Sequence, residues 1–352
     1  MHNRIIKNVL YVGNLLGRHG FTPGVIETLG PLLEEEGYHV YYAGTSRKKV
    51  IRLIEIILKV TFLGKKANYI LIDTYSTTAF WFAYFAAIVA RGIRVPYVPI
   101  LHGGDLPRRL TNSKRASKSL FNNSYVNVAV SSYLKHEFEA RGFNVVLIPN
   151  SIEISKYKFR LGDTCRPRLL WVRSFHRQYN PNMAADVLKE LLKIYPQSEL
   201  CMVGPDKDGS MEEFRNYVNT LGISEHVKIT GLLKKEEWIK LSEDYDFFIN
   251  TTNIDNTPVS VIEAMALGLI VISTDAGGLK YLLNAGHDSI MVARGDAIAM
   301  SKAISMAMND KSSCKELSFN ARQSAMNFDW SRVKNQWTDL LLVNNERTKR
   351  QD

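Results

Sequence analysis

The sequence FFINTTNIDNTPVSVIEAMALGLIVISTDAGG, residues 247–278, holds two short apolar runs separated by a polar loop and a longer apolar segment. The runs 247–250 and 270–273 have the length and apolar content of buried strands. Between them, Thr257 is a residue type that caps helices, and proline favours the first helical position, so we expect a helix that starts at Pro258. A strand, a helix and a second strand in this order are typical of a parallel sheet covered by helices.

The same alternation of strands and helices runs through the rest of the chain. Two sets of six expected strands favour an α/β protein with two doubly wound, Rossmann-like domains that face a central cleft. Twelve strands do not fit a closed eight-stranded barrel. We expect an N-terminal domain at 1–160, a C-terminal domain at 161–329, and a last helix with a charged tail at 330–352 that packs back toward the N-terminal domain. The other expected strands are 5–12, 38–43, 69–72, 95–100, 126–130, 145–148, 168–172, 199–203, 227–230 and 289–292.

Length and composition narrow the class of protein. With 352 residues and 45% hydrophobic side chains, the chain is long enough for two buried cores. Its three cysteines lie far apart without a CxxC pair, which disfavours a disulfide framework and a structural zinc site and suits a reducing compartment. The longest apolar run, 79–90, is shorter than the about 20 residues that span a bilayer, and no signal peptide is evident, so we expect a cytoplasmic protein.

The net charge of +10 is unevenly distributed along the chain. Residues 1–150 carry 19 Lys and Arg against 9 Asp and Glu, whereas residues 151–352 carry 26 against 26. The whole excess therefore belongs to the first part of the chain. This favours an anionic partner for the first part of the chain. The candidates are a membrane surface, a phospholipid-linked acceptor and a nucleic acid.

Segment 47–66 mixes basic and apolar residues, and two interpretations of it are open. As a basic amphipathic helix it can lie on an anionic membrane, or its apolar face can cover the sheet of the first domain. A second basic run lies nearer to the expected cleft, and both runs favour a lipid-linked or membrane-proximal acceptor. No base-stacking motif or helix-turn-helix signature supports nucleic acid as a partner. The residues expected on the acceptor or membrane side of the protein are Arg47, Lys48, Lys49, Arg108 and Arg109.

The helix expected at Pro258 begins next to two carboxylates. Its N-terminus offers free N–H groups and the positive end of a helix dipole, which suit a diphosphate. Asp255 lies in the loop ahead of the helix, and Glu263 lies along it with a side chain that leans back toward the N-terminus. Carboxylates bind vicinal hydroxyls, so one of the two suits a sugar and the other a ribose.

These residues resemble the hallmark of the family-four retaining glycosyltransferases of the GT-B fold. The match consists of Asp255 and Glu263 with seven residues between them, Ala-Met-Ala at 264–266, Gly268, and a second motif, Asp-Ala-Gly-Gly, at 275–278. The family more often has Glu at the first acidic position, and the shorter Asp255 leaves the sugar preference open.

The resemblance implies roles for the residues of this segment. Glu263 is expected to bind the ribose hydroxyls, and Asp255, with the backbone that follows it, is expected to bind the donor sugar and its diphosphate. The backbone positions are those of Asn256, Thr257, Pro258 and Val259.

Two further candidate residues follow the expected strand 168–172. Arg173 ends this strand, where a guanidinium can bind a diphosphate in a bidentate manner and stabilise it as a leaving group. The family carries an Arg at this strand end and a Lys a few residues later. Arg173 matches the Arg, but no Lys follows, and Arg177 is the candidate replacement.

The first half contributes two glycine-rich loops. His102 comes just after the expected strand 95–100 and before Gly103-Gly104, and it matches a family His that contacts the donor sugar near its reacting carbon. The loop 13–24 has four glycines but no GxGxxG spacing, which disfavours a hydride-transfer enzyme. The resemblance implies that Gly20 of this loop approaches the diphosphate or the acceptor.

The sequence Asp206-Lys207-Asp208 matches the DxD motif with which other glycosyltransferases bind a divalent ion. Here it lies between Gly204-Pro205 and Gly209, a composition that is typical of a turn. The GT-B resemblance also implies that an Arg and a helix dipole neutralise the diphosphate. We therefore expect no metal ion and no other cofactor.

On this resemblance we expect a retaining glycosyltransferase of the hexosyltransferase type, peripheral at the inner face of the membrane. It would transfer a sugar from a nucleotide sugar, by default a UDP-sugar, to a glycan or lipid-linked acceptor in cell-surface polysaccharide or glycolipid synthesis. Three alternatives stay open. They are another GT-B enzyme, such as an inverting transferase or a sugar-nucleotide epimerase, a non-catalytic sugar-nucleotide-binding subunit, and a basic nucleic-acid-binding module.

Overall fold

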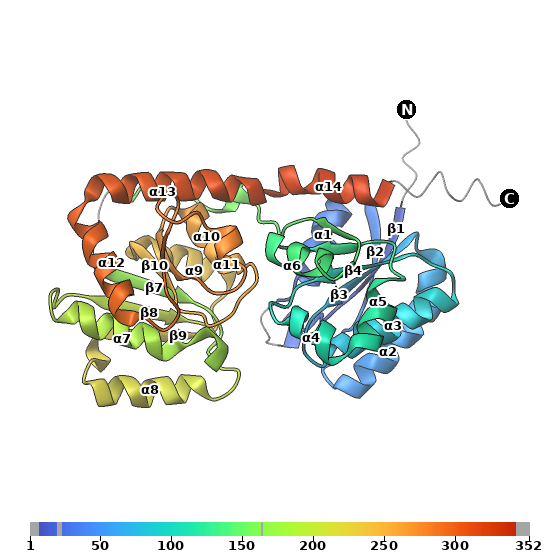
Figure 1. Ribbon diagram of the computed structural model, residues 1–352, viewed down its shortest axis with the longest axis horizontal. Coiled ribbons are helices and arrows are strands. Elements are labelled where there is room, and N and C mark those ends of the chain that lie inside the picture. Colours follow the sequence, from blue (N-terminus) through green and yellow to red (C-terminus); the bar gives the residue numbers. More distant parts are fainter. Residues whose placement is uncertain (1–6, 20–22, 163–164, 343–352) are drawn as a thin grey trace. The chain divides into compact units, whose positions relative to one another are not determined.

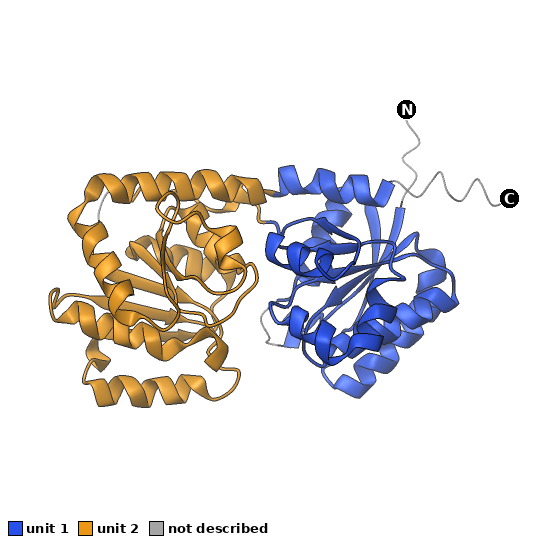
Figure 2. Cartoon of the chain, in the orientation of Figure 1, with its two compact units in different colours: residues 1–151, 330–352 blue, residues 152–329 orange. Residues whose placement is uncertain are grey.

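The computed structural model describes residues 7–19, 23–162 and 165–342, which form two compact units (Figure 2). Unit 1 comprises residues 1–151 and 330–352, and unit 2 comprises residues 152–329. The chain leaves unit 1 after Ser151 because Ile152 and Tyr157 are already buried in a core of unit 2. The structure therefore divides the chain after Ser151, whereas the sequence analysis placed the division at position 160.

The described residues contain all twelve strands expected from the sequence, and they form two parallel six-stranded sheets (Figure 1). The α/β class with two doubly wound domains is thereby confirmed. Unit 1 contains β1 Lys7–Val12, β2 Tyr38–Ala43, β3 Tyr69–Thr74, β4 Tyr97–Leu101, β5 Asn127–Ala129 and β6 Val145–Leu147. Unit 2 contains β7 Arg168–Val172, β8 Glu199–Val203, β9 Val227–Gly231, β10 Phe247–Asn250, β11 Ile270–Thr274 and β12 Ile290–Val292.

Helices connect most of the successive strands, and further helices follow the last strand. In unit 1 they are α1 Ile26–Glu35, α2 Lys49–Leu63, α3 Ala79–Gly92, α4 Leu106–Asn112, α5 Lys114–Phe121, α6 Ser132–Glu139 and α14 Trp330–Leu342. In unit 2 they are α7 Pro181–Leu192, α8 Ser210–Leu221, α9 Lys235–Leu241, α10 Val259–Leu267, α11 Leu279–Leu282, α12 Ala297–Asn309 and α13 Lys311–Ala325. Short 3-10 helices are η1 Gly17–His19, η2 Gly64–Lys66, η3 Ile154–Lys156, η4 Arg177–Tyr179, η5 Ser224–His226, η6 Ser242–Asp244 and η7 Met326–Phe328. None of the helices within the described ranges is long and apolar enough to cross a membrane.

The strand order of each sheet marks where a ligand is expected. Unit 1 has the order β2-β1-β3-β4-β5-β6, and unit 2 has the order β12-β11-β10-β7-β8-β9. The direction of winding reverses between β1 and β3 in unit 1 and between β7 and β10 in unit 2. Ligands of doubly wound sheets bind at the carboxyl ends of the strands next to such a reversal. The loops that follow these four strands are therefore the places to look for a site.

Each sheet is covered on both faces. In unit 1, helices α2 to α6 bury one face, and α1 and α14 bury the other. Helix α14 packs on this second face through four buried residues at helical spacing. In unit 2, α7, α8 and α12 cover one face, α9, α10 and α11 cover the other, and α13 contributes residues to both cores. The residues that bury α14 are Trp330, Val333, Trp337 and Leu341.

Helix α10 corrects one detail of the sequence prediction. It begins at Val259, and the N-cap position belongs to Pro258 instead of Thr257. The backbone of Pro258 is extended, and its carbonyl oxygen accepts the first helical hydrogen bonds, from the N–H groups of Val261 and Ile262. The cap position thus lies one residue after the Thr257 expected from the sequence.

Candidate functional site

Four charged side chains meet next to the point of winding reversal in unit 2. Arg173 follows β7 and Asp255 follows β10, and these two residues form an ion pair. Glu263 lies on α10, and its Oε1 is 2.7 Å from Nζ of Lys235, the first residue of α9. The sequence analysis placed the first three residues at one anion site. Lys235 was not anticipated.

The Arg173 guanidinium has unused hydrogen-bonding capacity. Its face lies over the ring of Tyr179, 4.4 Å from the ring centre, and one of its nitrogens pairs with Asp255. Its Nε is buried and has no hydrogen-bond partner among the residues that the structure describes. Burial lowers the pKa of Arg173, and the nearby Glu263 carboxylate opposes this shift, but a guanidinium stays charged at neutral pH. A buried cation with a free donor is suited to an anionic oxygen.

Asp255 and Glu263 are both buried and both held in place. One oxygen of Asp255 accepts a hydrogen bond from the backbone N–H of Asn256 at 2.9 Å. The Glu263 carboxylate accepts a hydrogen bond from the Tyr157 hydroxyl at 2.7 Å. Burial and the charge of Glu263 raise the pKa of Tyr157, so this hydroxyl remains a neutral donor. The orientation of the two carboxylates is thus set before any ligand binds.

The glycines of the second motif support the loop that carries Asp255. The N–H of Gly278 donates to the carbonyl oxygen of Asp255 at 2.9 Å. A Cβ atom at Gly277 or Gly278 would overlap the backbone of Asp255 or Asn256, and Gly277 also has a φ of +57°. Glycine is required because another backbone approaches this closely. The two sequence motifs therefore occur together for a structural reason.

The N-terminus of α10 faces this cluster with polar atoms. Asn256, Thr257 and Pro258 are buried, and Val259 opens the helix. The hydroxyl oxygen of Ser260 is buried without a hydrogen-bond partner in the described part of the chain, and the sequence analysis did not single it out. Free N–H groups and an unused hydroxyl at a helix N-terminus provide donors for an anion.

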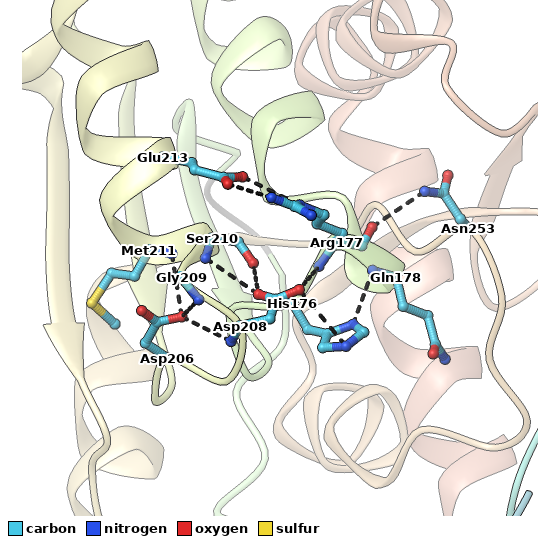
Figure 3. A network of polar contacts seen from close by, with 10 residues as sticks. All are labelled: His176, Arg177, Gln178, Asp206, Asp208, Gly209, Ser210, Met211, Glu213 and Asn253. Atoms are coloured by element: carbon cyan, nitrogen blue, oxygen red, sulfur yellow. Dashed lines mark hydrogen bonds and ion pairs between the residues drawn. The ribbon is translucent and has the colours of Figure 1, made fainter. Parts of the chain in front are cut away.

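Arg177 is held elsewhere in unit 2 (Figure 3). Its guanidinium pairs with Glu213 on α8, and its backbone N–H donates to Oδ2 of Asp208 at 3.0 Å. The side chain is largely exposed to solvent. Arg177 therefore fastens two loops to each other, and its guanidinium is paired with α8.

The Asp206-Lys207-Asp208 segment forms a turn that leads into α8 (Figure 3). Oδ1 of Asp206 accepts hydrogen bonds from the N–H groups of Asp208 and Gly209, and Oδ1 of Asp208 accepts one from the N–H of Ser210. These are the bonds of an Asx turn. Within the described residues, no three His, Cys, Asp or Glu side chains are grouped closely enough to hold a metal ion.

His102 belongs to a buried network at the winding reversal of unit 1. Its Nε2 is 2.7 Å from Oδ1 of Asp73, the next-to-last residue of β3, and the same oxygen accepts a hydrogen bond from the Tyr11 hydroxyl at 3.0 Å. The ring of Tyr75 stacks on the imidazole, with 5.1 Å between ring centres. Burial and the charge of Asp73 raise the pKa of Tyr11, so its hydroxyl stays a donor. These contacts hold the imidazole in one orientation.

The glycine-rich loop after β1 is organised around Glu27. The carboxylate of Glu27 accepts hydrogen bonds from the N–H groups of Gly17 and Gly24, both at 2.9 Å. Gly20, which the sequence analysis assigned to this loop as a ligand contact, lies outside the described residues.

The basic candidates of unit 1 differ in their surroundings. Arg47, Lys48 and Lys49 are exposed at the start of α2. Arg108 pairs with Asp105 at 2.8 Å. Arg109 donates from Nε to the carbonyl oxygen of Ser76 at 3.0 Å and lies over the ring of Phe80, so it supports the loop after β3.

Two of the residues that the sequence analysis missed lie near the end of a strand or at the start of a helix. Asp73 is the next-to-last residue of the apolar strand β3, and Lys235 is the first residue of α9, the helix that follows β9. Searching every loop at the carboxyl end of a strand would have found both. Tyr157 and Tyr179 gave no such signal, because their contacts depend on segments distant in the sequence.

Two family models match nearly the whole chain. The model described as Glycosyltransferase Family 4 matches residues 8–156, and the model described as Glycosyl transferases group 1 matches residues 155–324. The chain belongs to the family-four glycosyltransferases. This confirms the family resemblance seen in the acidic pair and the glycine motif.

Curated relatives of this family-four glycosyltransferase are distant. A putative teichuronic acid biosynthesis glycosyltransferase, TuaC of Bacillus subtilis, is 27% identical over 234 residues, which cover 62% of this chain and 57% of TuaC. An uncharacterized glycosyltransferase of Methanocaldococcus jannaschii is 21% identical over 333 residues, which cover 92% of this chain and 90% of the relative. The match to a Campylobacter jejuni N-acetylgalactosaminyltransferase, which is named for a PP-undecaprenol-linked glycan, is 26% identical and covers 49% of this chain and 47% of that protein. The chain thus spans about half the length of several curated relatives that it matches.

Solved structures with the same fold can be superposed on almost the whole length of this family-four glycosyltransferase. HepE of Anabaena, in complex with UDP and glucose, has a TM-score of 0.77 at 19% identity and covers 95% of this chain and 99% of HepE. Sucrose-phosphate synthase of Thermosynechococcus elongatus has a TM-score of 0.79 at 16% identity, with coverages of 95% and 98%. These similarities identify the fold as GT-B.

Proposed function

We propose that this protein is a retaining glycosyltransferase that moves a sugar from a nucleoside-diphosphate sugar to a glycan or lipid-linked acceptor in cell-surface polysaccharide or glycolipid synthesis. The observation that carries the proposal is the cluster at the ends of β7 and β10. There two buried carboxylates, Asp255 and Glu263, each face a cation, Arg173 and Lys235 respectively. Unit 2 binds the donor, and unit 1 serves the acceptor and supplies His102.

Each residue of the cluster has a distinct task in this proposal. Glu263 accepts the ribose hydroxyls, with its carboxylate oriented by Tyr157 and Lys235. Arg173 and the N–H groups at the start of α10 bind the diphosphate and stabilise the charge that develops as it departs. Without donor, Asp255 neutralises Arg173. The unused Nε–H of Arg173 is the donor that a phosphate oxygen would take up.

Retention of the anomeric configuration is part of the proposal. Asp255 is paired with Arg173 and bonded to the backbone of Asn256, which makes its carboxylate a poor nucleophile. For a retaining transferase this argues against a covalent intermediate on Asp255, and the family resemblance supports attack by the acceptor on the face from which the diphosphate leaves. Asp73 holds the His102 imidazole in one orientation, and the role proposed for His102 is contact with the donor sugar. The anomeric configuration of the product, determined by NMR, tests this part of the proposal.

Relatives support the choice of substrates. HepE was solved with UDP-glucose, which supports UDP as the nucleotide carried by this chain. The Campylobacter jejuni relative is named for an undecaprenol diphosphate-linked acceptor, and a relative of Mycobacterium leprae is a phosphatidyl-myo-inositol mannosyltransferase. These names support a lipid-linked acceptor and, with the exposed Arg47, Lys48 and Lys49, attachment of this protein to an anionic membrane at its cytoplasmic face.

A nucleotide-sugar screen tests the proposal. We expect one class among UDP-, GDP- and ADP-sugars to raise the melting temperature of the purified chain by several degrees. A ligand at about 100 times its Kd stabilises the folded state by about 2.7 kcal/mol. If no nucleotide sugar changes the melting temperature, the proposed function is wrong.

Activity and binding assays with the nucleotide sugar from the screen separate the alternatives. Donor binding without turnover on any acceptor would indicate a non-catalytic subunit, and epimerised donor without acceptor would indicate an epimerase. An inverted product would indicate an inverting transferase. Salt-sensitive binding to DNA or RNA without donor affinity would indicate a nucleic-acid-binding module.

We predict that substitutions of Lys235 and Arg177 have different effects on donor binding. We expect Lys235→Ala to weaken donor binding about 10-fold, because the Glu263 carboxylate loses a charged partner that orients it. Arg177→Ala is the matched control, since this guanidinium pairs with Glu213 on α8. It should change the affinity less than about 2-fold. Isothermal titration calorimetry on both variants measures the difference, and a larger loss for Arg177→Ala would reverse the assignment.

A further inference from the structure

Helix α2 exposes a row of large apolar side chains. Val50, Ile54, Leu58 and Phe62 recur at every fourth position, and each is between 50% and 72% exposed. Side chains with this spacing lie on one side of a helix. The opposite side packs on the sheet of unit 1 through Ile56 and Val60, which are fully buried, so the exposed row is not needed for the core.

Helix α3 extends this apolar face. It lies beside α2 on the same face of the sheet, and the two helices contact each other (Figure 1). Trp81, Phe85 and Ile88 are exposed on α3, whereas its alanines, such as Ala83 and Ala87, are buried against the sheet. The outward side of two neighbouring helices therefore carries aliphatic and aromatic residues.

The charges around this face have a single sign. The sequence ranges 47–66 and 79–94 contain one acidic residue, Glu55, and its carboxylate accepts hydrogen bonds from the backbone of Thr45 and Ser46 and pairs with Lys59. These hydrogen bonds, opposed by burial, lower the pKa of Glu55 to about 2. Exposed basic residues lie at both ends of the face, namely Arg47, Lys48 and Lys49, then Lys65 and Lys66, and Arg94 after α3.

We propose that the outward face of α2 and α3 inserts into the boundary between headgroups and acyl chains of an anionic bilayer. An amphipathic surface with basic residues at its edges binds such a bilayer by burying apolar area and by attracting acidic headgroups. Long basic side chains at the edges can reach the headgroups, and tryptophan favours this boundary. The inference deepens the proposed function, since a lipid-linked acceptor is found at that surface, but its test does not use transfer activity.

Trp81 provides a direct probe of insertion. It is 40% exposed, whereas Trp171, Trp238, Trp330 and Trp337 are at most 7% exposed. We expect vesicles of phosphatidylglycerol and phosphatidylcholine with brominated acyl chains to quench the tryptophan fluorescence of the full chain, and we expect Trp81→Phe to abolish the quenching. Vesicle binding without quenching would show adsorption on the headgroups alone and would overturn the insertion.

Vesicle flotation compares the apolar face with a matched control. We expect Ile54→Ser, Leu58→Ser and Phe62→Ser together to weaken binding to anionic vesicles by about 100-fold or more. The control replaces Ile194, Met306 and Phe319 of unit 2 by serine. These residues are similarly exposed, at 64%, 73% and 50%, but come from separate parts of that unit, and this control should bind like the original chain. The loss should persist at high salt, because salt screens charges but does not weaken apolar burial.

Three outcomes would overturn the proposal. They are the absence of vesicle binding by the original chain, equal binding of the two triple variants, and a concentration-dependent dimer that the face variant abolishes. The last outcome, measured by light scattering, would assign the face to a second copy of this chain. The melting temperature and its shift with nucleotide sugar are recorded for every variant. Vesicle binding can therefore be observed even if no nucleotide sugar changes the melting temperature. The membrane proposal and the proposed function can thus be rejected independently.

Discussion

Replacing Glu263 by alanine is expected to weaken donor binding by about 100-fold or more, equivalent to about 3 kcal/mol. The carboxylate is buried at the middle of α10 and is oriented by the Tyr157 hydroxyl and Lys235, so its two oxygens are in place for the ribose hydroxyls. Alanine removes both acceptors and leaves a water-filled space. Isothermal titration calorimetry with the nucleotide sugar identified in the screen measures the loss.

Two further variants separate binding from folding in this experiment. Glu263→Gln keeps the size of the side chain and one acceptor oxygen, so we expect an intermediate loss of affinity. Glu190→Ala removes a carboxylate of α7 that pairs with Lys193, away from the cluster, and this variant should bind donor like the original chain. If Glu263→Ala keeps full affinity and an unchanged melting temperature, the ribose-binding role is wrong.

Arg173→Ala is expected to lower kcat by about 100- to 1000-fold with a smaller change in KM. In the proposed mechanism, the guanidinium acts most strongly on the charge of the departing diphosphate, and that charge is fully developed only late in the reaction. The substitution also leaves the Asp255 carboxylate buried without its cation, which lowers the stability by as much as about 3 kcal/mol. Steady-state kinetics below the melting temperature of the variant measures kcat and KM separately.

Companion variants distinguish the two effects of removing Arg173. Combining Arg173→Ala with Asp255→Asn removes the unpaired charge, so we expect stability to recover while kcat stays low. Arg173→Lys keeps a cation but loses the bidentate donor geometry, and we expect a loss of about 10-fold. A kcat that recovers together with stability in the double variant would contradict a direct role of Arg173 in catalysis.

The fold was largely predictable because its signals are local. Buried parallel strands are short apolar runs, and each of the twelve expected runs is a strand. The errors are small and occur at element ends, as at α10, where the cap is Pro258 instead of Thr257. Cap positions depend on a few backbone angles, which residue preferences predict only to within a residue or so.

The candidate site was predictable only in part. Asp255, Glu263 and Arg173 follow from a motif and from their positions after strands, and these three residues do lie in one cluster. Arg177 was chosen because it is near Arg173 in the sequence, but it pairs with Glu213 on α8. The cation next to Glu263 is Lys235, from a helix that precedes α10 in the sequence. Nearness along the chain is a poor guide here, because η4 turns the Arg177 side chain toward α8.

The sequence by itself determined the α/β class, the two sets of six strands and the acidic pair, because apolar periodicity and short motifs act over neighbouring residues. The tertiary structure alone decided which side chains share a site. It brought Lys235 to Glu263 and Asp73 to His102, and it divided the apolar residues of α2 between a buried side and an exposed side. These outcomes depend on which strands are neighbours in the sheet and how much of each helix the sheet covers. Both are set by packing between residues far apart in the chain.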